Sequence, residues 1–207
     1  MEPFTTLTAV AAPLLRDNID TDAIIPSREM RTVSKKGLAA GLFSGWRYAA
    51  IGSRDPDPDF VLNDPAYAGA QILVTGANFG CGSSREHAVW ALAEYGFRAI
   101  IAPSFNPIFR GNCVANGVVP AVLPGSLVEK MAAGLAAGPG RTLTVDLVAQ
   151  RIDGPAQESH RFQIDPESRD ALLAGADPID QTLRLIRDIR AFIDVDRKTR
   201  SWAYPKG

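Results

Sequence analysis

One glycine-rich segment holds the residues of this sequence whose types and spacing could perform chemistry. It reads Gly76-Ala77-Asn78-Phe79-Gly80-Cys81-Gly82-Ser83-Ser84-Arg85-Glu86-His87. An apolar run over 71–75, typical of a buried strand, precedes it, and a helical pattern over 84–95 follows. A loop of this kind directs free N–H groups and the positive end of a helix dipole at one point. The segment therefore predicts a binding site for an anion.

Two common phosphate-binding signatures do not fit the segment. No Gly-Lys-Ser/Thr follows it, as a Walker A motif requires, and Arg85 stands where the dinucleotide fingerprint has its last glycine. Arg85 is expected in the first helical turn, where the dipole favours carboxylates. We interpret this mismatch as a sign that an anionic ligand compensates for the arginine.

Ser83 has two interpretations. With Glu86 it has the spacing of a capping box, in which the serine accepts a hydrogen bond at the helix start and the glutamate reciprocates. The doubled serine, the flanking glycines and the adjacent Arg85 favour a functional role.

The other reactive side chains leave alternatives open. His87, one turn inside the helix, is equally suited to be a base or a packed, hydrogen-bonded residue. Cys81 could be a nucleophile activated by the helix N-terminus, but a small loop-filling thiol fits better, because no histidine is placed to activate it. Cys113 is expected in the core. His160 is expected on a hairpin strand, and nothing in the sequence around it indicates a catalytic role.

The elements that must position this segment form a βαβ unit of strand 71–75, the loop, helix 84–95 and strand 98–102. The remaining expected elements are strand 5–10, a helix from about 104, strand 118–123, helix 126–137 with a Ser126–Glu129 capping box, hairpin strands 141–148 and 161–164, and helices 166–174 and 178–195, the last with Ile179, Leu183, Ile186 and Ile193 facing inward. We expect one domain over 1–196, with a long irregular excursion over 27–60 and a flexible tail over 197–207.

Composition excludes several classes of protein. The 207 residues include 22 Lys and Arg against 23 Asp and Glu, so no basic excess is available to bind nucleic acid. No window of about 18 apolar residues predicts a membrane span. The N-terminus lacks a signal-peptide pattern, so a cytoplasmic location is expected. Two cysteines cannot ligate an iron–sulfur cluster or an all-cysteine zinc site, so no metal is expected in this chain.

Four blocks of the sequence carry a resemblance to a known family. They run from Asn18 to Pro26, from Asp59 to Asn63, from Asn78 to His87, and from Ile101 through Asn112 and Asn116-Gly117 to Pro120. The third block resembles the swivelling domain of the aconitase superfamily, and the whole chain is similar to the small subunits of bacterial 3-isopropylmalate dehydratases. The resemblance implies an α/β fold, a three-layer β/β/α swivelling domain with a mixed, partly barrel-like sheet and a central βαβ unit.

The same resemblance implies a divided active site. A large subunit would carry a [4Fe-4S] cluster that binds the hydroxyl and one carboxylate of a small dicarboxylate substrate, and this chain would bind no cofactor. The two would form a heterodimer or a higher heteromer. The reaction would convert 2-isopropylmalate to 3-isopropylmalate by dehydration and rehydration, a step of leucine biosynthesis.

The family pattern also implies residue roles. By position, Ser83 would be the base, acting as an alkoxide that the loop N–H groups, the helix N-terminus and Arg85 stabilise. Ser84, Arg85 and Gly82 would bind a substrate carboxylate, with Arg28 as a further substrate-binding residue.

The residues expected to brace the glycine-rich loop are Asp20, Thr21, Asp22, Glu86 and His87. Two carboxylates so close together could suggest a metal site. Bracing of the glycine-rich loop explains them better, because no third ligand is nearby in the sequence.

One position departs from the family pattern. After Pro26 the family usually has an aromatic residue and then leucine, in the stretch expected to contact the variable group of the substrate. Here Glu29 and Met30 occupy these positions. Glu29 could face solvent, pair with Arg28 or Arg31, or mark a paralogue that acts on a different alkylmalate.

Three hypotheses therefore remain. The first is a hydro-lyase subunit that is active only with its large subunit. The second is a stand-alone anion- or nucleotide-binding module that uses the same helix N-terminus. The third is a hydrolase that depends on Cys81.

Overall fold

The computed structural model describes residues 1–30, 34–154 and 158–204. Arg31, a candidate partner for Glu29, lies outside these ranges, as do Pro155 of the expected hairpin turn and the last three residues of the tail. Across the described residues, no helix combines the length and the apolar character needed to cross a bilayer.

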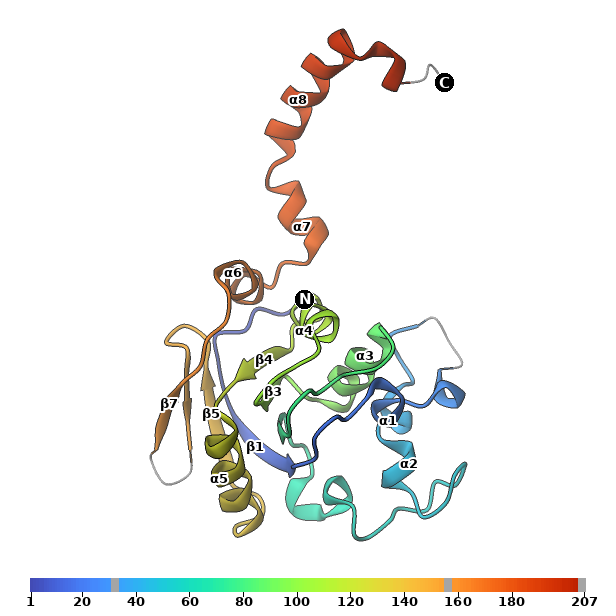
Figure 1. Ribbon diagram of the computed structural model, residues 1–207, viewed down its shortest axis with the longest axis vertical. Helices are drawn as coiled ribbons and strands as arrows, with labels where there is room; N and C mark the ends of the chain where they lie inside the picture. The colour runs from blue at the N-terminus through green and yellow to red at the C-terminus, as the bar shows by residue number, and fades with distance from the viewer. Residues whose placement is uncertain (31–33, 155–157, 205–207) are drawn as a thin grey trace.

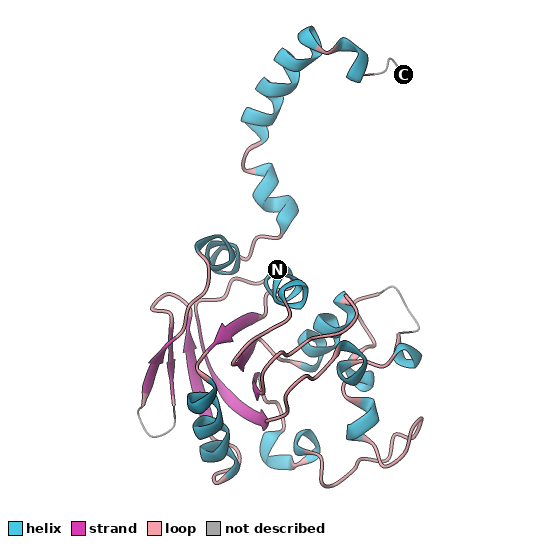
Figure 2. Cartoon of the chain, viewed as in Figure 1, coloured by secondary structure: helices cyan, strands magenta, loops and turns pink. Residues whose placement is uncertain are grey.

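The described strands form one mixed, curled sheet with the order β4-β3-β2-β1-β5-β6-β7 (Figures 1 and 2). The strands are β1 Thr6–Leu14, β2 Ile72–Thr75, β3 Ala99–Ala102, β4 Val119–Val122, β5 Thr142–Asp146, β6 Arg151–Asp153 and β7 Ser159–Arg161. β1 runs parallel to β2 and antiparallel to β5, so it joins a parallel half to an antiparallel half. The predicted α/β fold, with a mixed, partly barrel-like sheet around a central βαβ unit, is confirmed.

Helices cover both faces of the parallel half. The helices are α1 Thr21–Ile24, α2 Ser44–Arg47, α3 Glu86–Tyr95, α4 Pro107–Ala115, α5 Gly125–Ala136, α6 Pro166–Ala174, α7 Pro178–Leu183 and α8 Ile186–Thr199. Successive residues of a strand point to opposite faces. Accordingly, Leu73 packs in the core cluster that contains Leu92 of α3, whereas Ile72 packs in the cluster that contains Val128 of α5. The carboxyl end of β2 and the start of α3 are thus anchored in the core on either side of the glycine-rich loop.

Several predicted boundaries are wrong at helix starts. α5 begins at Gly125 after Pro124, without a side-chain cap, so the Ser126–Glu129 capping box does not form. α4 begins at Pro107, with the side chain of Asn106 accepting hydrogen bonds from the first turn, and not near residue 104. In both cases a proline with its fixed φ sets the start. The predicted helix over 166–174 is confirmed, and Gly175 ends it with a φ of +61°.

The predicted pairing of strand 161–164 with strand 141–148 is wrong. β6 lies between them: β5 pairs with β6, and β6 pairs with β7, in which His160 lies opposite Ile152. A strand of three residues is too short to show an alternating pattern, so the sequence did not reveal it.

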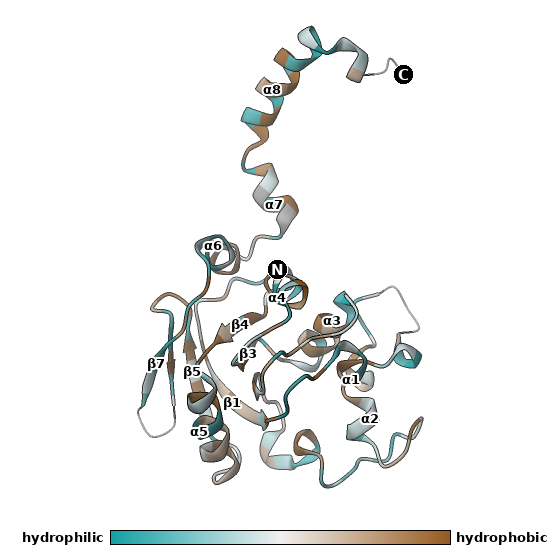
Figure 3. Ribbon diagram, viewed as in Figure 1, coloured by the Kyte–Doolittle hydropathy of each residue, from teal (hydrophilic) through white to brown (hydrophobic). Residues whose placement is uncertain are grey.

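α7 and α8 form an arm that extends away from the body of the domain (Figure 1). The single helix expected over 178–195 is interrupted after Leu183, and its apolar stripe is not inward-facing, because Ile179 is 69% exposed and Leu183 is 54% exposed. Apolar and polar residues alternate along α8 (Figure 3). The periodicity identified the stripe, but it carries no information about which surface, if any, covers it.

The segment expected as a tail continues this arm. α8 extends to Thr199, and residues 201–203 form a short 3-10 turn. Asp196 accepts hydrogen bonds from Arg200 Nε and from the hydroxyl of Tyr204, both at 2.7 Å.

Candidate active site

The glycine-rich loop lies between two segments that are distant in the sequence. Three backbone hydrogen bonds join it to residues 18–21: Asn18 N to Ala77 O at 2.8 Å, Gly80 N to Ile19 O at 2.8 Å and Thr21 N to Cys81 O at 3.0 Å. On the other side, Phe79 N donates to Ser104 O at 3.1 Å, and Asn106 N donates to Phe79 O at 3.0 Å. Three of the sequence blocks therefore form one structural unit around the loop.

Two glycines of the loop have backbone conformations that other residues rarely adopt. Gly80 has a φ of +74° and Gly82 a φ of +84°. A Cβ on Gly80 would overlap the ring of Phe109, which packs edge-to-face on Phe79. A Cβ on Gly82 would lie 3.3 Å from the Cβ of Asp20. The loop is therefore shaped by steric demands as well as by hydrogen bonds.

Ser83 and Ser84 are exposed at the end of this loop, before α3. The hydroxyl of Thr21 donates a 2.8 Å hydrogen bond to the carbonyl oxygen of Ser83. α3 starts at Glu86 and has no side-chain cap at its N-cap residue, Arg85. The expected helix start at residue 84 is therefore wrong, and the structure does not contain the alternative capping box. Ser83 is held through its backbone while its side chain faces solvent.

Arg85 does not lie in the first turn of α3, contrary to the sequence-based expectation. Its backbone is extended, with φ −129° and ψ 105°. Its guanidinium forms an ion pair with the carboxylate of Asp22, and the arginine side chain is 24% exposed against 55% for the aspartate. The mismatch with the helix dipole therefore disappears, because a positive side chain at the N-cap can turn away from the helix axis. The ion pair ties the residue before α3 to α1, which contains Asp22.

The remaining loop-support residues split into two groups. Asp20 caps the short helix α1, accepting from Ala23 N at 2.7 Å, and forms a β-bridge with Cys81. Glu86 faces away from the loop and accepts hydrogen bonds from Trp90 and Asn116. His87 packs its ring on Trp90, with the ring centroids 4.7 Å apart.

The cysteines do not form a set that fits a cluster. Cys113 is fully buried in α4, as predicted for a core residue, and burial raises the pKa of its thiol. A cluster needs accessible thiolates, and only the half-buried Cys81 remains. Within the residues the structure describes, no three His, Cys, Asp or Glu side chains gather as a metal site would require.

Arg28 and Glu29 lie in a charged cluster on the excursion. The carboxylate of Glu29, whose side chain is 10% exposed, lies 2.7 Å from Arg54 Nη2 and 3.7 Å from Arg28 Nε. Arg28 also donates to Ser44 Oγ at 3.2 Å. Burial alone would raise the pKa of Glu29, but the hydrogen bond and the charge of Arg54 lower it overall. Of the alternatives given for Glu29, pairing with Arg28 is therefore confirmed, and exposure to solvent is wrong.

Sequence reasoning missed three residues that shape this region: Arg54, Trp90 and Asn116. Arg54 follows Glu29 by 25 residues in an irregular segment, so no periodicity links the two. Asn116 stands in the fourth sequence block, and that position was the available signal for it.

Comparisons with known proteins agree with this fold and loop. The family model described as the aconitase C-terminal domain matches residues 1–125, and the LeuD_N model matches residues 129–166. The sheet and the glycine-rich loop at the start of α3 therefore define a swivelling domain of the aconitase class.

Full-length relatives narrow the class to one family. A 3-isopropylmalate dehydratase small subunit from Cupriavidus necator is 57% identical over 208 residues and covers 100% of both chains. One from Rhodospirillum centenum is 52% identical, covering 98% of this chain and 99% of that protein. The crystal structure of a 3-isopropylmalate dehydratase from Methanocaldococcus jannaschii matches with a TM-score of 0.66 and 26% identity, covering 89% of this chain and 99% of the other. The chain belongs to the family of 3-isopropylmalate dehydratase small subunits.

Proposed function

We propose that this chain is the small subunit of a hydro-lyase that converts 2-isopropylmalate to 3-isopropylmalate in leucine biosynthesis. One observation carries the proposal: the exposed Ser83 precedes Arg85 by two residues at the start of α3, where Thr21 binds the carbonyl oxygen of Ser83 and Asp22 pairs with the guanidinium of Arg85. Family membership supplies the substrate class, because the relatives are named for this dehydratase. The stand-alone anion-binding module and the Cys81-dependent hydrolase lose their support for the same reason.

Ser83 is proposed as the base. As an alkoxide, its oxygen takes the proton from the carbon next to the one that bears the hydroxyl, and the carbon–oxygen bond breaks. The hydroxide that leaves becomes water by taking a proton from an acid that we place on the large subunit. An ordinary serine hydroxyl is far too weak an acid to ionise unaided. The N–H groups at the start of α3, its dipole and the guanidinium of Arg85 supply the stabilisation. In the second half of the reaction, Ser83 returns its proton to one alkene carbon, and the hydroxide of a water molecule adds to the other, with the opposite regiochemistry. The remaining proton of that water returns to the acid, which gives the isomer.

Arg85, with Ser84 and the backbone at Gly82, is proposed to bind a substrate carboxylate. Arg85 already faces a carboxylate, that of Asp22. A substrate carboxylate offers the same partner chemistry, since guanidinium and carboxylate form two parallel hydrogen bonds when geometry permits. Arg28 is proposed as a further contact to the substrate. Its position beside Glu29 and Ser44 places it on the excursion and not on the loop.

A large subunit is proposed to complete the site. Gly82, Ser83 and Ser84 are all exposed, and a stabilised alkoxide requires water to be excluded. The [4Fe-4S] cluster is proposed to reside on that subunit, where it would bind the substrate hydroxyl; the cysteines of this chain do not fit it. The assembly would be a heterodimer or a higher heteromer in the cytoplasm.

A related substrate is a second candidate, because of Glu29. Its largely covered carboxylate lies in the stretch that is expected to contact the variable group of the substrate. A charged group there favours a malate with a small or polar substituent over one with an isopropyl group. An assay of the purified complex against several 2-alkylmalates separates the two candidates.

The test is anaerobic co-expression with the large subunit, followed by an assay of 2-isopropylmalate conversion. Ser83→Ala is expected to abolish turnover while the subunits still co-purify. The isolated chain is expected to be inactive. Turnover by the isolated chain in air and without iron would contradict the proposal.

A further inference from the structure

The carboxylate of Glu86, the first residue of α3, points toward α4. Its Oε1 accepts hydrogen bonds from Trp90 Nε1 at 3.2 Å and from Asn116 Nδ2 at 2.8 Å. Trp90 lies one turn further along α3, and Asn116 is the C-cap residue of α4. The start of one helix is therefore tied to the end of another.

Asn116 connects three segments of the chain. Besides Glu86, its Nδ2 donates to the carbonyl oxygen of Asn112 at 2.9 Å, and its Oδ1 accepts from Lys35 Nζ at 3.0 Å. The ammonium of Lys35 also lies 5.3 Å from the centroid of the Trp90 ring. All of the hydrogen-bonding groups of the Asn116 side chain are thus engaged, so its orientation is fixed.

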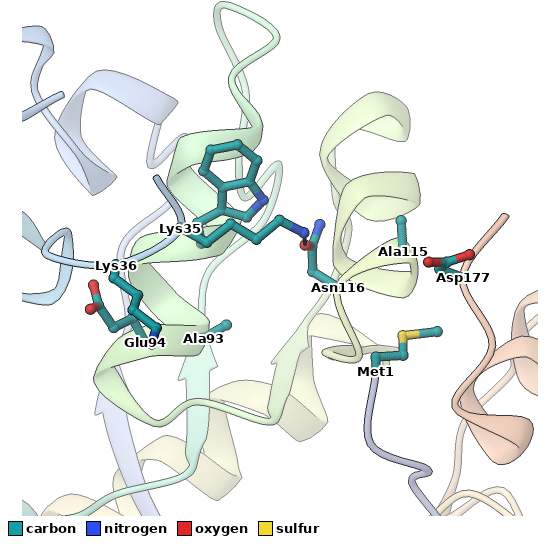
Figure 4. Close-up of a pocket in the computed structure, with 9 residues that line it drawn as sticks. Met1, Lys35, Lys36, Ala93, Glu94, Ala115, Asn116 and Asp177 are labelled. Carbon is teal, nitrogen blue, oxygen red and sulfur yellow. Dashed lines mark hydrogen bonds between the residues drawn. The ribbon is translucent and has the colours of Figure 1, made fainter. Parts of the chain in front are cut away.

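This network borders a pocket of about 400 Å³ (Figure 4). Lys35, Trp90 and Asn116 line it, and Figure 4 shows Lys35 extending toward Asn116. Open space therefore lies on one side of these side chains. The hydrogen bonds of Asn116 and Trp90 are what fix the direction of Glu86.

The direction of Glu86 matters for the residue beside it. Arg85 directly precedes Glu86, and its guanidinium is proposed to bind the substrate carboxylate. A second carboxylate turned back toward the loop would compete for that guanidinium and repel a dicarboxylate. Because Trp90 and Asn116 hold it, the carboxylate of Glu86 interacts favourably with the positive end of the α3 dipole without occupying the anion site.

We propose that Asn116 and Trp90 are positioning residues for the reaction. By fixing Glu86, they hold the start of α3, and with it Arg85, in the geometry that binds substrate. This inference rests on the proposed function of the loop.

Three substitutions in the assembled complex test it. Asn116→Asp replaces the donor to Glu86 with a like charge and is expected to raise KM about tenfold or more, with a smaller change in kcat. Trp90→Phe removes one donor and keeps the ring, so a rise of about threefold is expected. Glu86→Gln keeps the acceptor oxygen and is expected to leave KM within about twofold of the unmodified enzyme.

The pH dependence provides a readout that a purely structural role would not change. The carboxyl introduced by Asn116→Asp can donate to Glu86 once it is protonated, so the ratio of its KM to that of the unmodified enzyme should fall as the pH is lowered. Asp146→Ala is the control, because it removes the side-chain acceptor of Ala149 N in the turn after β5, in the antiparallel half of the sheet. A control that raises KM as much as Asn116→Asp, or an Asn116→Asp KM within twofold of normal, would overturn the inference.

Hydrogen exchange on the full chain separates this inference from the proposed function. Peptides covering residues 82–88 should exchange faster in Asn116→Asp than in the unmodified chain, and not in Glu86→Gln or Asp146→Ala. If the unmodified complex failed to convert 2-isopropylmalate, the proposed function would fall while this measurement still decided the positioning role. Unchanged exchange in Asn116→Asp would refute that role.

Discussion

The hydroxyl of Thr21 donates a hydrogen bond to the carbonyl oxygen of Ser83 across 2.8 Å. Thr21 is 1% exposed, at the start of α1, whereas Ser83 is exposed at the end of the glycine-rich loop. A buried donor thus fixes the backbone of the proposed base without touching its reactive oxygen. This hydrogen bond therefore joins α1 to the residue that we propose as the base.

Removal of this hydrogen bond should reduce turnover. Thr21→Val keeps the shape but loses the donor, so we expect kcat of the complex to fall about tenfold to a hundredfold, with a stability loss of about 1 kcal/mol. Thr21→Ser keeps the hydroxyl and should retain most of the activity. The measurement is kcat beside thermal unfolding. Equal kcat values for the two variants would argue against this role.

Arg85→Lys should separate activity from stability. The Arg85–Asp22 pair is partly exposed, and exposed pairs contribute about 0–1 kcal/mol, so the unfolding midpoint should barely change. A lysine cannot reproduce the planar, two-pronged contact to a carboxylate, so kcat/KM should drop about a hundredfold or more. Steady-state kinetics and urea unfolding of the same preparations test this. A near-normal kcat/KM would remove Arg85 from the substrate-binding role.

The ion pairs of Glu29 should make stability depend on pH. Burial acts to raise the pKa of Glu29, but Arg54 lowers it overall, so the folded-state value lies below the unfolded value of about 4.3. Its stabilisation is then present above that unfolded value and is lost as the pH falls through the folded one. The Glu29→Gln variant should have a lower free energy of unfolding than the unmodified protein at neutral pH. Between about pH 5 and pH 3 that free energy should fall less in the variant than in the unmodified protein. Urea unfolding at several pH values measures this, and an unchanged slope would contradict it.

The loop should reject a side chain at Gly80. Gly80→Ala places a Cβ against the ring of Phe109 at a φ of +74°, so we expect a loss of about 2–4 kcal/mol. Gly37→Ala is the matched control, because its φ is +88° but its surroundings are open. That change should cost about 1 kcal/mol. Similar losses for both variants in denaturant unfolding would mean that contact with Phe109 adds nothing.

Local patterns in the sequence predicted the parts of this protein that local forces determine. The buried strands β2 and β3 are continuous apolar runs, and α6 has a proline at its start and a glycine just after its end. The glycines and the serine pair mark the glycine-rich loop in the sequence itself. Their roles in the reaction remain predictions.

Long-range contacts determine what the sequence could not predict. The direction of the Glu86 side chain depends on Asn116, 30 residues away. Its carboxylate accepts a hydrogen bond from Asn116 in place of the one that a capping box with Ser83 would provide. The pairing of Glu29 with Arg54 joins two irregular segments that no pattern links. For the same reason α3 starts two residues later than expected: Asp22 and Asn116, the tertiary partners of Arg85 and Glu86, override the local capping preference.

The arm formed by α7 and α8 has a consequence for proteolysis. Exposed arginines such as Arg184, Arg187 and Arg190 lie along it, and few contacts hold it to the body. Trypsin should therefore cut here before it cuts the sheet, releasing a short fragment and leaving a trimmed domain. Any partner that covers the apolar stripe of α8 would slow that first cut. The rate at which the fragment appears therefore measures how much of the arm is covered in a given assembly.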